Sequence, residues 1–140
     1  MAWRNHRTDL PPFYLLDDPD RLHRLSRLTG IDCPVQEIHS AAEAAAKSKT
    51  GLPVLRLSQQ VSALPGDDST ADGAMVIESI DRAIDAAMDG SAAGITTNPI
   101  QKSVLYEAGF GYPGHTEFLA ALAGPDVTPV MMLAAPAIRV

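Results

Sequence analysis

Short apolar runs alternate with helical patterns along this chain, and that alternation constrains its fold more than any other feature. Apolar runs at 13–16, 35–38 and 53–57 are bounded by turn residues, and a helical pattern follows each of them. Strands that alternate with helices form a largely parallel sheet with helices on its faces. We therefore predict a three-layer α/β/α fold around a mostly parallel sheet.

The ends of the predicted helices carry residues that favour helix starts and stops. Asp18 is a natural N-cap for the first helix, and Gly30 is a natural terminator. A capping box at Ser40–Glu43 opens a second helix, and Gly90 ends a third that begins near Met75. The solvated face of this third helix is expected to hold Glu78, Asp81, Arg82 and Asp85.

The second half of the chain continues the alternation. We predict a strand at 93–97, a helix at 100–108, a helix at 116–123 and a strand at 130–134 that is buried on both faces. The apolar end from Val130 to Val140 has no covering elements after it, which also predicts self-association through that edge.

Composition limits the classes of partner. The formal net charge of −6 and the pI near 5.0 argue against broad attraction to nucleic acid or to an anionic membrane. No apolar run is long enough for a membrane span or a signal peptide. The single cysteine, Cys33, suits a reducing compartment. We therefore expect a cytoplasmic protein without nucleic-acid or membrane partners.

The stretch GFGYPG at 109–114 contains G-x-G-x-x-G, the form of a dinucleotide-binding fingerprint. That fingerprint requires a preceding strand, whereas a helix is predicted here, so we reject this interpretation. Gly109 is expected to end the helix in the left-handed region, and the rest of the stretch to form a turn. The turn places His115 and Thr116, with Thr116 as N-cap, at a helix N-terminus that favours an anion.

A second turn of the same character follows the predicted strand at 93–97. Asn98 is expected to cap the next helix, with Lys102 one turn inside it. The carboxyl end of a strand is the usual ligand side of an open α/β sheet, so Thr97, Asn98 and Lys102 are candidate phosphate contacts. Capping alone would also explain Asn98 and Thr116, and an ordinary surface position would explain Lys102.

Three segments, ITTNPIQK, PGHTEFLA and VMML with its RV continuation, resemble the 4-hydroxythreonine-4-phosphate dehydrogenase family of vitamin B6 biosynthesis. The resemblance covers nearly the whole chain and is strongest from Gly94 to Val140. It implies a two-domain architecture similar to isocitrate and isopropylmalate dehydrogenases, of which residues 1–140 form a single partial α/β domain. It also implies NAD-dependent oxidation of 4-hydroxythreonine 4-phosphate with loss of CO2, a divalent metal that polarises the oxygen, and a homodimer that shares each active site.

Residue by residue, His115 and Thr116 match the family's substrate-binding histidine and threonine. The chain departs from the family in three places. It has no match to the segment with which the family opens, G-[DE]-P-A-G-I-G-P. It also has no match to the family's T-x-H-L-P-L segment, where the metal-binding histidines begin. Gln101 stands at a position where a histidine is common in the family. No ligand spacing relates the four histidines present, His6, His23, His39 and His115. We therefore expect a partial chain that lacks the metal ligands and has no dehydrogenase activity alone.

Two alternatives remain open. The first is a family dehydrogenase that acts on another phosphorylated hydroxy acid, such as a four-carbon aldonate phosphate, and turnover of both substrates would distinguish it. The second is a non-catalytic module that binds phosphate or assists assembly, and binding without chemistry would distinguish that one.

Overall fold

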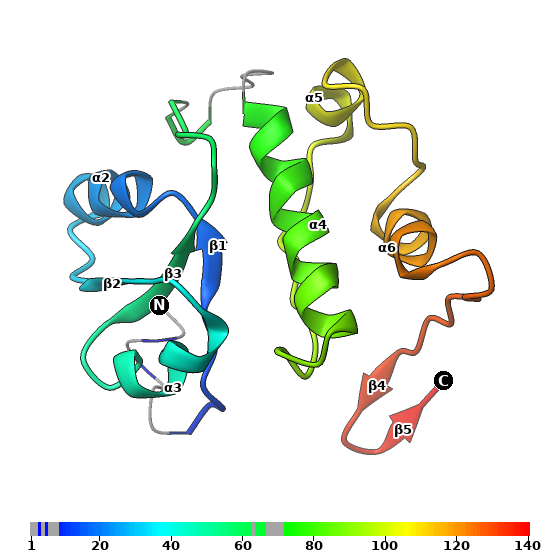
Figure 1. The fold of residues 1–140 in the computed structure, drawn as a ribbon, viewed down its shortest axis with the longest axis horizontal. Coiled ribbons are helices and arrows are strands. Elements are labelled where there is room, and N and C mark those ends of the chain that lie inside the picture. The colour runs from blue at the N-terminus through cyan, green and yellow to red at the C-terminus, as the bar shows by residue number, and fades with distance from the viewer. Residues whose placement is uncertain (1–2, 4, 6–8, 63, 67–71) are drawn as a thin grey trace. The chain divides into compact units, whose positions relative to one another are not determined.

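The computed structural model describes residues 3, 5, 9–62, 64–66 and 72–140 (Figure 1). The chain divides into two compact units, Met1–Phe110 and Gly111–Val140. The first unit contains β1 (Leu15–Asp17), α2 (Pro19–Thr29), β2 (Val35–Ile38), the 3-10 helix η1 (Ala41–Glu43), α3 (Ala44–Lys47), β3 (Leu52–Arg56), α4 (Gly73–Met88) and α5 (Lys102–Glu107). The second unit contains α6 (His115–Ala123), β4 (Ala134–Ala135) and β5 (Ile138–Arg139).

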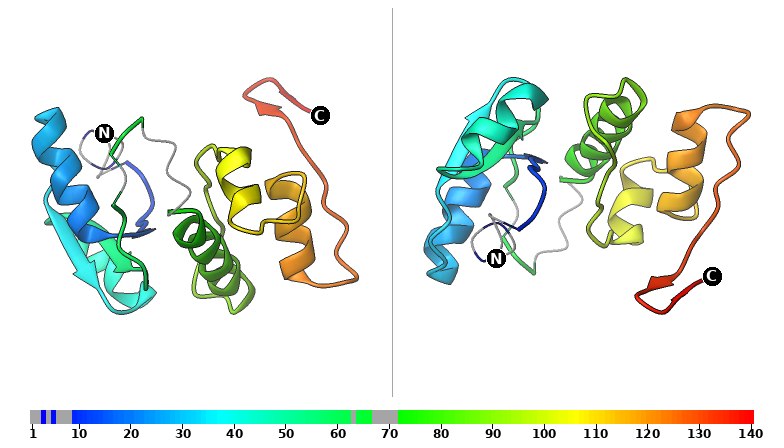
Figure 2. Two further views of the ribbon diagram at one scale, coloured as in Figure 1. Left: turned by 90° about the horizontal axis from the view of Figure 1, so that it is seen from above. Right: turned by 90° about the horizontal axis from the view of Figure 1, so that it is seen from below.

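The first unit is built on a three-stranded parallel sheet in the order β1-β3-β2. Leu15 lies opposite Val54 and Val35 lies opposite Leu52, so β3 is the central strand, and Val54 is fully buried. Helices α2 and α4 lie on opposite sides of β1 (Figures 1 and 2). The predicted α/β class, with a parallel sheet between helices, is confirmed, as are the three strands expected in the first half of the chain.

The core of the first unit is a cluster of Trp3, Leu52 and Val54. The Trp3 indole Nε1 donates a hydrogen bond of 2.9 Å to the Ser48 carbonyl, which satisfies the polar atom of this buried ring. Partly buried apolar residues pack around the cluster: Phe13, Leu15, Leu22, Cys33 and Val35.

Helix α2 begins and ends as its sequence predicts. The Asp18 side chain accepts a hydrogen bond of 2.9 Å from the Asp20 amide, and Gly30 ends the helix at a φ of 66°. The prediction of a capping box at Ser40 is wrong, because the Ser40 side chain makes no hydrogen bond to an amide of the helix that follows. Its hydroxyl instead donates to the Glu43 carboxylate, which also accepts from the His39 amide.

Helix α4 carries an ion pair between Glu78 and Arg82, four residues apart on its predicted solvated face, at 3.4 Å. The Glu78 carboxylate also accepts hydrogen bonds of 2.9 Å from the Ser58 amide and 2.6 Å from its hydroxyl, which attaches the chain after β3 to α4. Asp81 is less solvated than expected, because its side chain is half-buried. Its Oδ1 is buried without a hydrogen-bond partner among the described residues, and burial raises the pKa of this carboxyl, with Asp85 adding to the effect.

Two predicted strands do not form. Residues 93–97 contain neither strand nor helix, because a strand requires a hydrogen-bonded neighbour and none of the described strands pairs with them. Of the strand expected at 130–134, only Ala134 is part of a strand, as the first residue of β4. This short strand pairs antiparallel with β5. The expected burial of this segment is also wrong, since Val130 is 87% exposed and Leu133 is 71% exposed.

The two predicted caps in the second half of the chain are also wrong. Helix α5 begins at Lys102 with Gln101 in the N-cap position, so Asn98 lies before it. Helix α6 begins at His115 with Gly114 in the N-cap position, so Thr116 is its second residue. A helix of six residues, such as α5, is stabilised by packing rather than by capping. In α5 the packed residue is Leu105, which is buried. Within the described residues, every helix is too short or too polar to span a bilayer.

Candidate functional site

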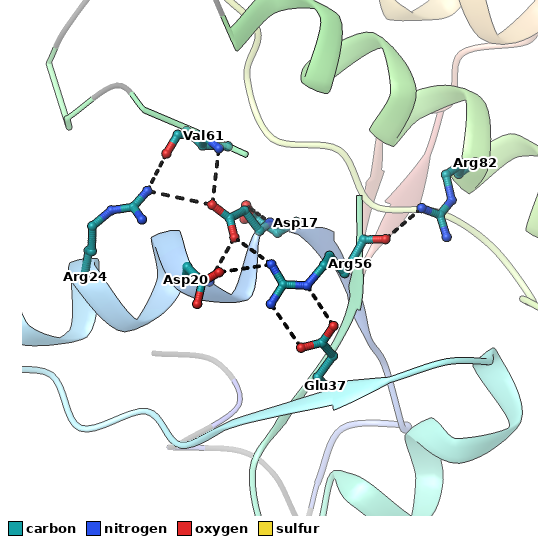
Figure 3. Close-up of polar contacts among 8 residues, drawn as sticks. Asp17, Asp20, Arg24, Glu37, Arg56, Val61 and Arg82 are labelled. Carbon is teal, nitrogen blue, oxygen red and sulfur yellow. Dashed lines mark hydrogen bonds and ion pairs between the residues drawn. The ribbon is translucent and has the colours of Figure 1, made fainter. Parts of the chain in front are cut away.

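Charged side chains gather at the carboxyl ends of the three parallel strands (Figure 3). We call this set the Arg56 network, and it comprises Asp18, Asp20, Arg24, Glu37 and Arg56. Arg56 ends β3, and its guanidinium donates to both Glu37 oxygens, at 2.8 Å from Nε and 3.1 Å from Nη2. Its Nη1 donates to Asp20 at 3.0 Å. The planar guanidinium therefore links the ends of β2 and β3 to the first turn of α2.

Asp18 is the buried centre of the network, with only 1% of its side chain exposed. Besides capping α2, its carboxylate accepts from the Val61 amide at 3.2 Å and from Arg56 Nη1 at 3.4 Å. Arg24 lies 3.7 Å from the same carboxylate and donates to the Val61 carbonyl. One carboxylate thus holds together the start of α2, the end of β3 and the loop that follows β3.

The Arg56 network lies where open α/β sheets commonly bind ligands, but its charged groups already pair with one another. Each member forms an ion pair with another member, so we interpret the network as structural. No sequence motif predicted this network. The available signal was a pair of aspartates, Asp17 and Asp18, at the end of one strand and an arginine at the end of another.

The network predicts a dependence of stability on pH. The hydrogen bond from Arg56 lowers the pKa of Glu37, so the unfolded state binds more protons at acid pH. This contribution is complete above about pH 5, where the unfolded carboxyl is ionised, and is lost as the pH falls through the lower, folded pKa. Urea unfolding should show Glu37→Gln to be less stable than the parent at neutral pH, by about 1 kcal/mol or less because the pair is exposed. The two proteins should be equally stable in acid, and an equal difference at both pH values would contradict the prediction.

The candidate phosphate contacts of the first unit lie on one exposed stretch. Thr97, Asn98 and Lys102 are all exposed, and Lys102 is the first residue of α5 rather than one turn inside a helix. The stretch leads into α5 without a side-chain cap. These residues are therefore accessible to a ligand, but the described residues around them do not enclose one.

The glycine-rich stretch behaves as the sequence predicts. It follows a helix, α5, which excludes the dinucleotide fingerprint, and Gly109 ends that helix at a φ of 89°. The Phe110 amide donates to the Leu105 carbonyl at 2.9 Å, and both side chains are buried. The first unit ends at Phe110 and the second begins at Gly111, so the stretch connects the two units.

The N-terminus of α6 is the most site-like feature of the second unit. The Tyr112 ring lies 4.9 Å from the Phe118 ring, which folds the preceding turn onto the first turn of α6. Gly114 supplies no side-chain cap, so the first amides of the helix point outward with their partial positive charge. His115 and Thr116 are half-buried there, and the His115 Nε2 is buried without a hydrogen-bond partner in the described part of the chain. This arrangement can bind an oxyanion or a hydroxyl group.

The sequence predicts one site from both stretches, but the structure assigns them to different units. Thr97, Asn98 and Lys102 belong to the first unit, whereas His115 and Thr116 belong to the second. Their convergence on one ligand therefore stays a prediction.

Residues able to bind a metal are not clustered in the described part of the chain. Across 9–62, 64–66 and 72–140, no group of three or more His, Cys, Asp or Glu side chains is arranged to hold a metal ion. A groove of about 230 Å³ lies between Tyr14 and Leu55 on one side and α4 on the other. Small-molecule sites usually measure about 300–1,000 Å³, so this groove is small for a ligand site.

Comparison with known proteins assigns the family. Residues 9–140 match the family model described as pyridoxal phosphate biosynthetic protein PdxA. The chain belongs to the PdxA family. It is 43% identical over 141 residues to the 4-hydroxythreonine-4-phosphate dehydrogenase of Methylorubrum populi, covering 94% of this chain and 40% of that relative. The enzyme of the same name from Bradyrhizobium diazoefficiens is 39% identical, with 98% of this chain and 43% of the relative covered.

A solved PdxA-family structure agrees with the fold. The crystal structure of a 4-hydroxythreonine-4-phosphate dehydrogenase from Burkholderia phymatum matches with a TM-score of 0.77 and 33% identity. The match covers 90% of this chain and 38% of that one. The chain therefore spans about 40% of the length of the PdxA relatives that it matches.

Proposed function

We propose that this chain supplies part of the substrate site of a PdxA-type enzyme, the NAD-dependent dehydrogenase that oxidises and decarboxylates 4-hydroxythreonine 4-phosphate in vitamin B6 biosynthesis. The observation that carries the proposal is the buried Nε2 of His115 at the N-terminus of α6, which has no hydrogen-bond partner among the described residues. A buried polar atom without a partner is costly, and a bound substrate oxygen would remove that cost. Membership of the PdxA family supports the identity of the substrate.

The chemistry proposed for the chain's own residues is binding and orientation. The first amides of α6 and the Thr116 hydroxyl can donate hydrogen bonds to substrate oxygens, and the His115 Nε2 can form one more. Thr97, Asn98 and Lys102 are proposed as further phosphate contacts. Lys102 would contribute the positive charge, since its ammonium group is exposed at the start of α5.

Family membership leads us to infer the remaining components. Residues 1–140 are one partial α/β domain of a larger two-domain dehydrogenase, which acts in the cytoplasm as a homodimer. NAD would supply the hydride acceptor for the substrate alcohol, and a divalent metal would polarise the alcohol oxygen. We infer that the metal ligands lie outside residues 1–140, because the family's metal-binding segment has no match in this sequence.

Titration calorimetry of the 140-residue chain tests this function. We expect it to bind 4-hydroxythreonine 4-phosphate but to produce no NADH with added NAD and Mg²⁺, because it spans only about 40% of its relatives. His115→Ala should weaken binding by about tenfold or more, since it removes a hydrogen bond to a charged ligand. His23→Ala is the matched control, because His23 is exposed on α2 and should leave binding unchanged.

Each other outcome is informative. Binding that His115→Ala leaves intact would contradict the assignment of the site, and measurable NADH formation would contradict the expected inactivity. Equal affinity for a four-carbon aldonate phosphate would favour a PdxA-family enzyme with a different substrate.

A further inference from the structure

A carboxylate lies beside the candidate site at the start of α6. Glu117 belongs to the first turn of this helix, and its side chain is exposed. A Cβ built at Gly114, the N-cap residue, would lie 3.4 Å from the Glu117 Oε2. The carboxylate therefore reaches back to the end of the helix where the first amides point outward. Within the described residues, Glu117 takes part in no ion pair.

The start of α6 thus presents donors and a negative charge side by side. The donors are the first amides and the Thr116 hydroxyl, and the buried Nε2 of His115 has no partner among the described residues. A lone anion is attracted by the partial positive charge of the helix but repelled by the full charge of Glu117. A ligand that carries an ammonium group next to an oxyanion matches both parts of the site.

We propose that Glu117 binds the ammonium group of an amino-acid substrate, while the first amides of α6 bind its carboxylate. This inference rests on the proposed function and names the part of the substrate that α6 recognises. In an amino acid the ammonium and carboxylate groups are attached to the same carbon, so they can reach neighbouring partners on one helix turn. Glu117 is then a specificity determinant, because 4-hydroxythreonine 4-phosphate has this ammonium group and a four-carbon aldonate phosphate has a hydroxyl group in its place.

A second role for Glu117 predicts a different result. A glutamate in the first turn of a helix also stabilises the helix through the dipole and by reaching back to the N-cap. That role alone would affect the binding of both ligands equally. Recognition of the ammonium group affects only the ligand that carries one, so the ratio of the two affinities separates the two roles.

Titration calorimetry of the 140-residue chain with both ligands measures this ratio. We expect the parent to bind 4-hydroxythreonine 4-phosphate about tenfold or more tightly than the aldonate phosphate, because only the former pairs with the carboxylate. Glu117→Gln should weaken the amino-acid ligand about tenfold and change the affinity for the aldonate phosphate by roughly twofold or less. Glu117→Asp keeps the charge and should retain part of the preference.

Asp126→Asn is the matched control. It removes one negative charge from the same unit, but Asp126 is exposed just past the other end of α6, so both affinities should stay unchanged. A parent that binds both ligands equally, through His115, would overturn the role of Glu117 and leave the proposed substrate site intact. A parent that binds neither ligand would overturn both proposals. A preference that survives Glu117→Gln, or equal weakening of both ligands with or without loss of helical circular dichroism, would assign Glu117 to the stability of α6 and overturn the inference.

Discussion

Replacing Asp18 with alanine is expected to lower the free energy of unfolding by about 2–4 kcal/mol, because it removes the N-cap of α2 and leaves a buried amide without its acceptor. The Asp18 side chain is 1% exposed, and its loss leaves the amides of Asp20 and Val61 without their acceptor. It also removes the buried partner of Arg56. Urea denaturation followed by circular dichroism and by Trp3 fluorescence measures the change.

Asp20 provides the matched control for this experiment. It pairs with Arg56 at 3.0 Å, but its side chain is 55% exposed, so Asp20→Ala should cost about 1 kcal/mol or less. Asp18→Asn should fall between the two, because an amide oxygen can still cap α2 but carries no charge. An Asp18→Ala variant no less stable than Asp20→Ala would show that Asp18 is not the centre of the network.

Gly51→Ala is the second substitution with a large expected effect, at about 2–3 kcal/mol. A Cβ at Gly51 would lie 2.6 Å from the Gln36 Cγ and 2.6 Å from the Pro34 carbonyl oxygen. That oxygen cannot move away freely, because it accepts a hydrogen bond of 2.7 Å from the Leu52 amide where β2 and β3 begin to pair. The added methyl group therefore forces the two strands apart at their first contact.

Gly94→Ala is the control for Gly51→Ala. Apart from its own chain neighbours, no described residue has an atom within 4 Å of a Cβ built at Gly94, so the same substitution should change the midpoint of urea unfolding little. If both glycines tolerate alanine equally, the close approach of β2 and β3 at Gly51 does not contribute to stability.

The structure decided which predicted strands and caps form. Residues 93–97 have the composition of a strand. A strand forms only when it hydrogen-bonds to a neighbouring strand, and none of the described strands pairs with these residues. Asn98 and Thr116 have the chemistry of N-caps, yet α5 and α6 begin at Lys102 and His115. In short helices the start depends on what the helix packs against, which local sequence does not encode.

The candidate site could be predicted in part. The sequence placed His115 and Thr116 at the start of a helix and rejected the glycine run as a nucleotide cradle, because both conclusions depend on neighbours in the chain. It did not reveal the orphaned Nε2 of His115 or the buried Oδ1 of Asp81, since burial is set by residues distant in the sequence.

By itself, the sequence determined the parallel α/β plan of the first unit, the boundaries of α2 and membership of the PdxA family, because these follow from apolar periodicity, local caps and short motifs. Only the tertiary structure decided that Asp18 and Arg56 meet in one network, that Gly51 must lack a side chain, and that the last strands form an exposed hairpin. These features depend on strand register and on contacts between residues far apart in the chain, for which a single sequence carries no local signal.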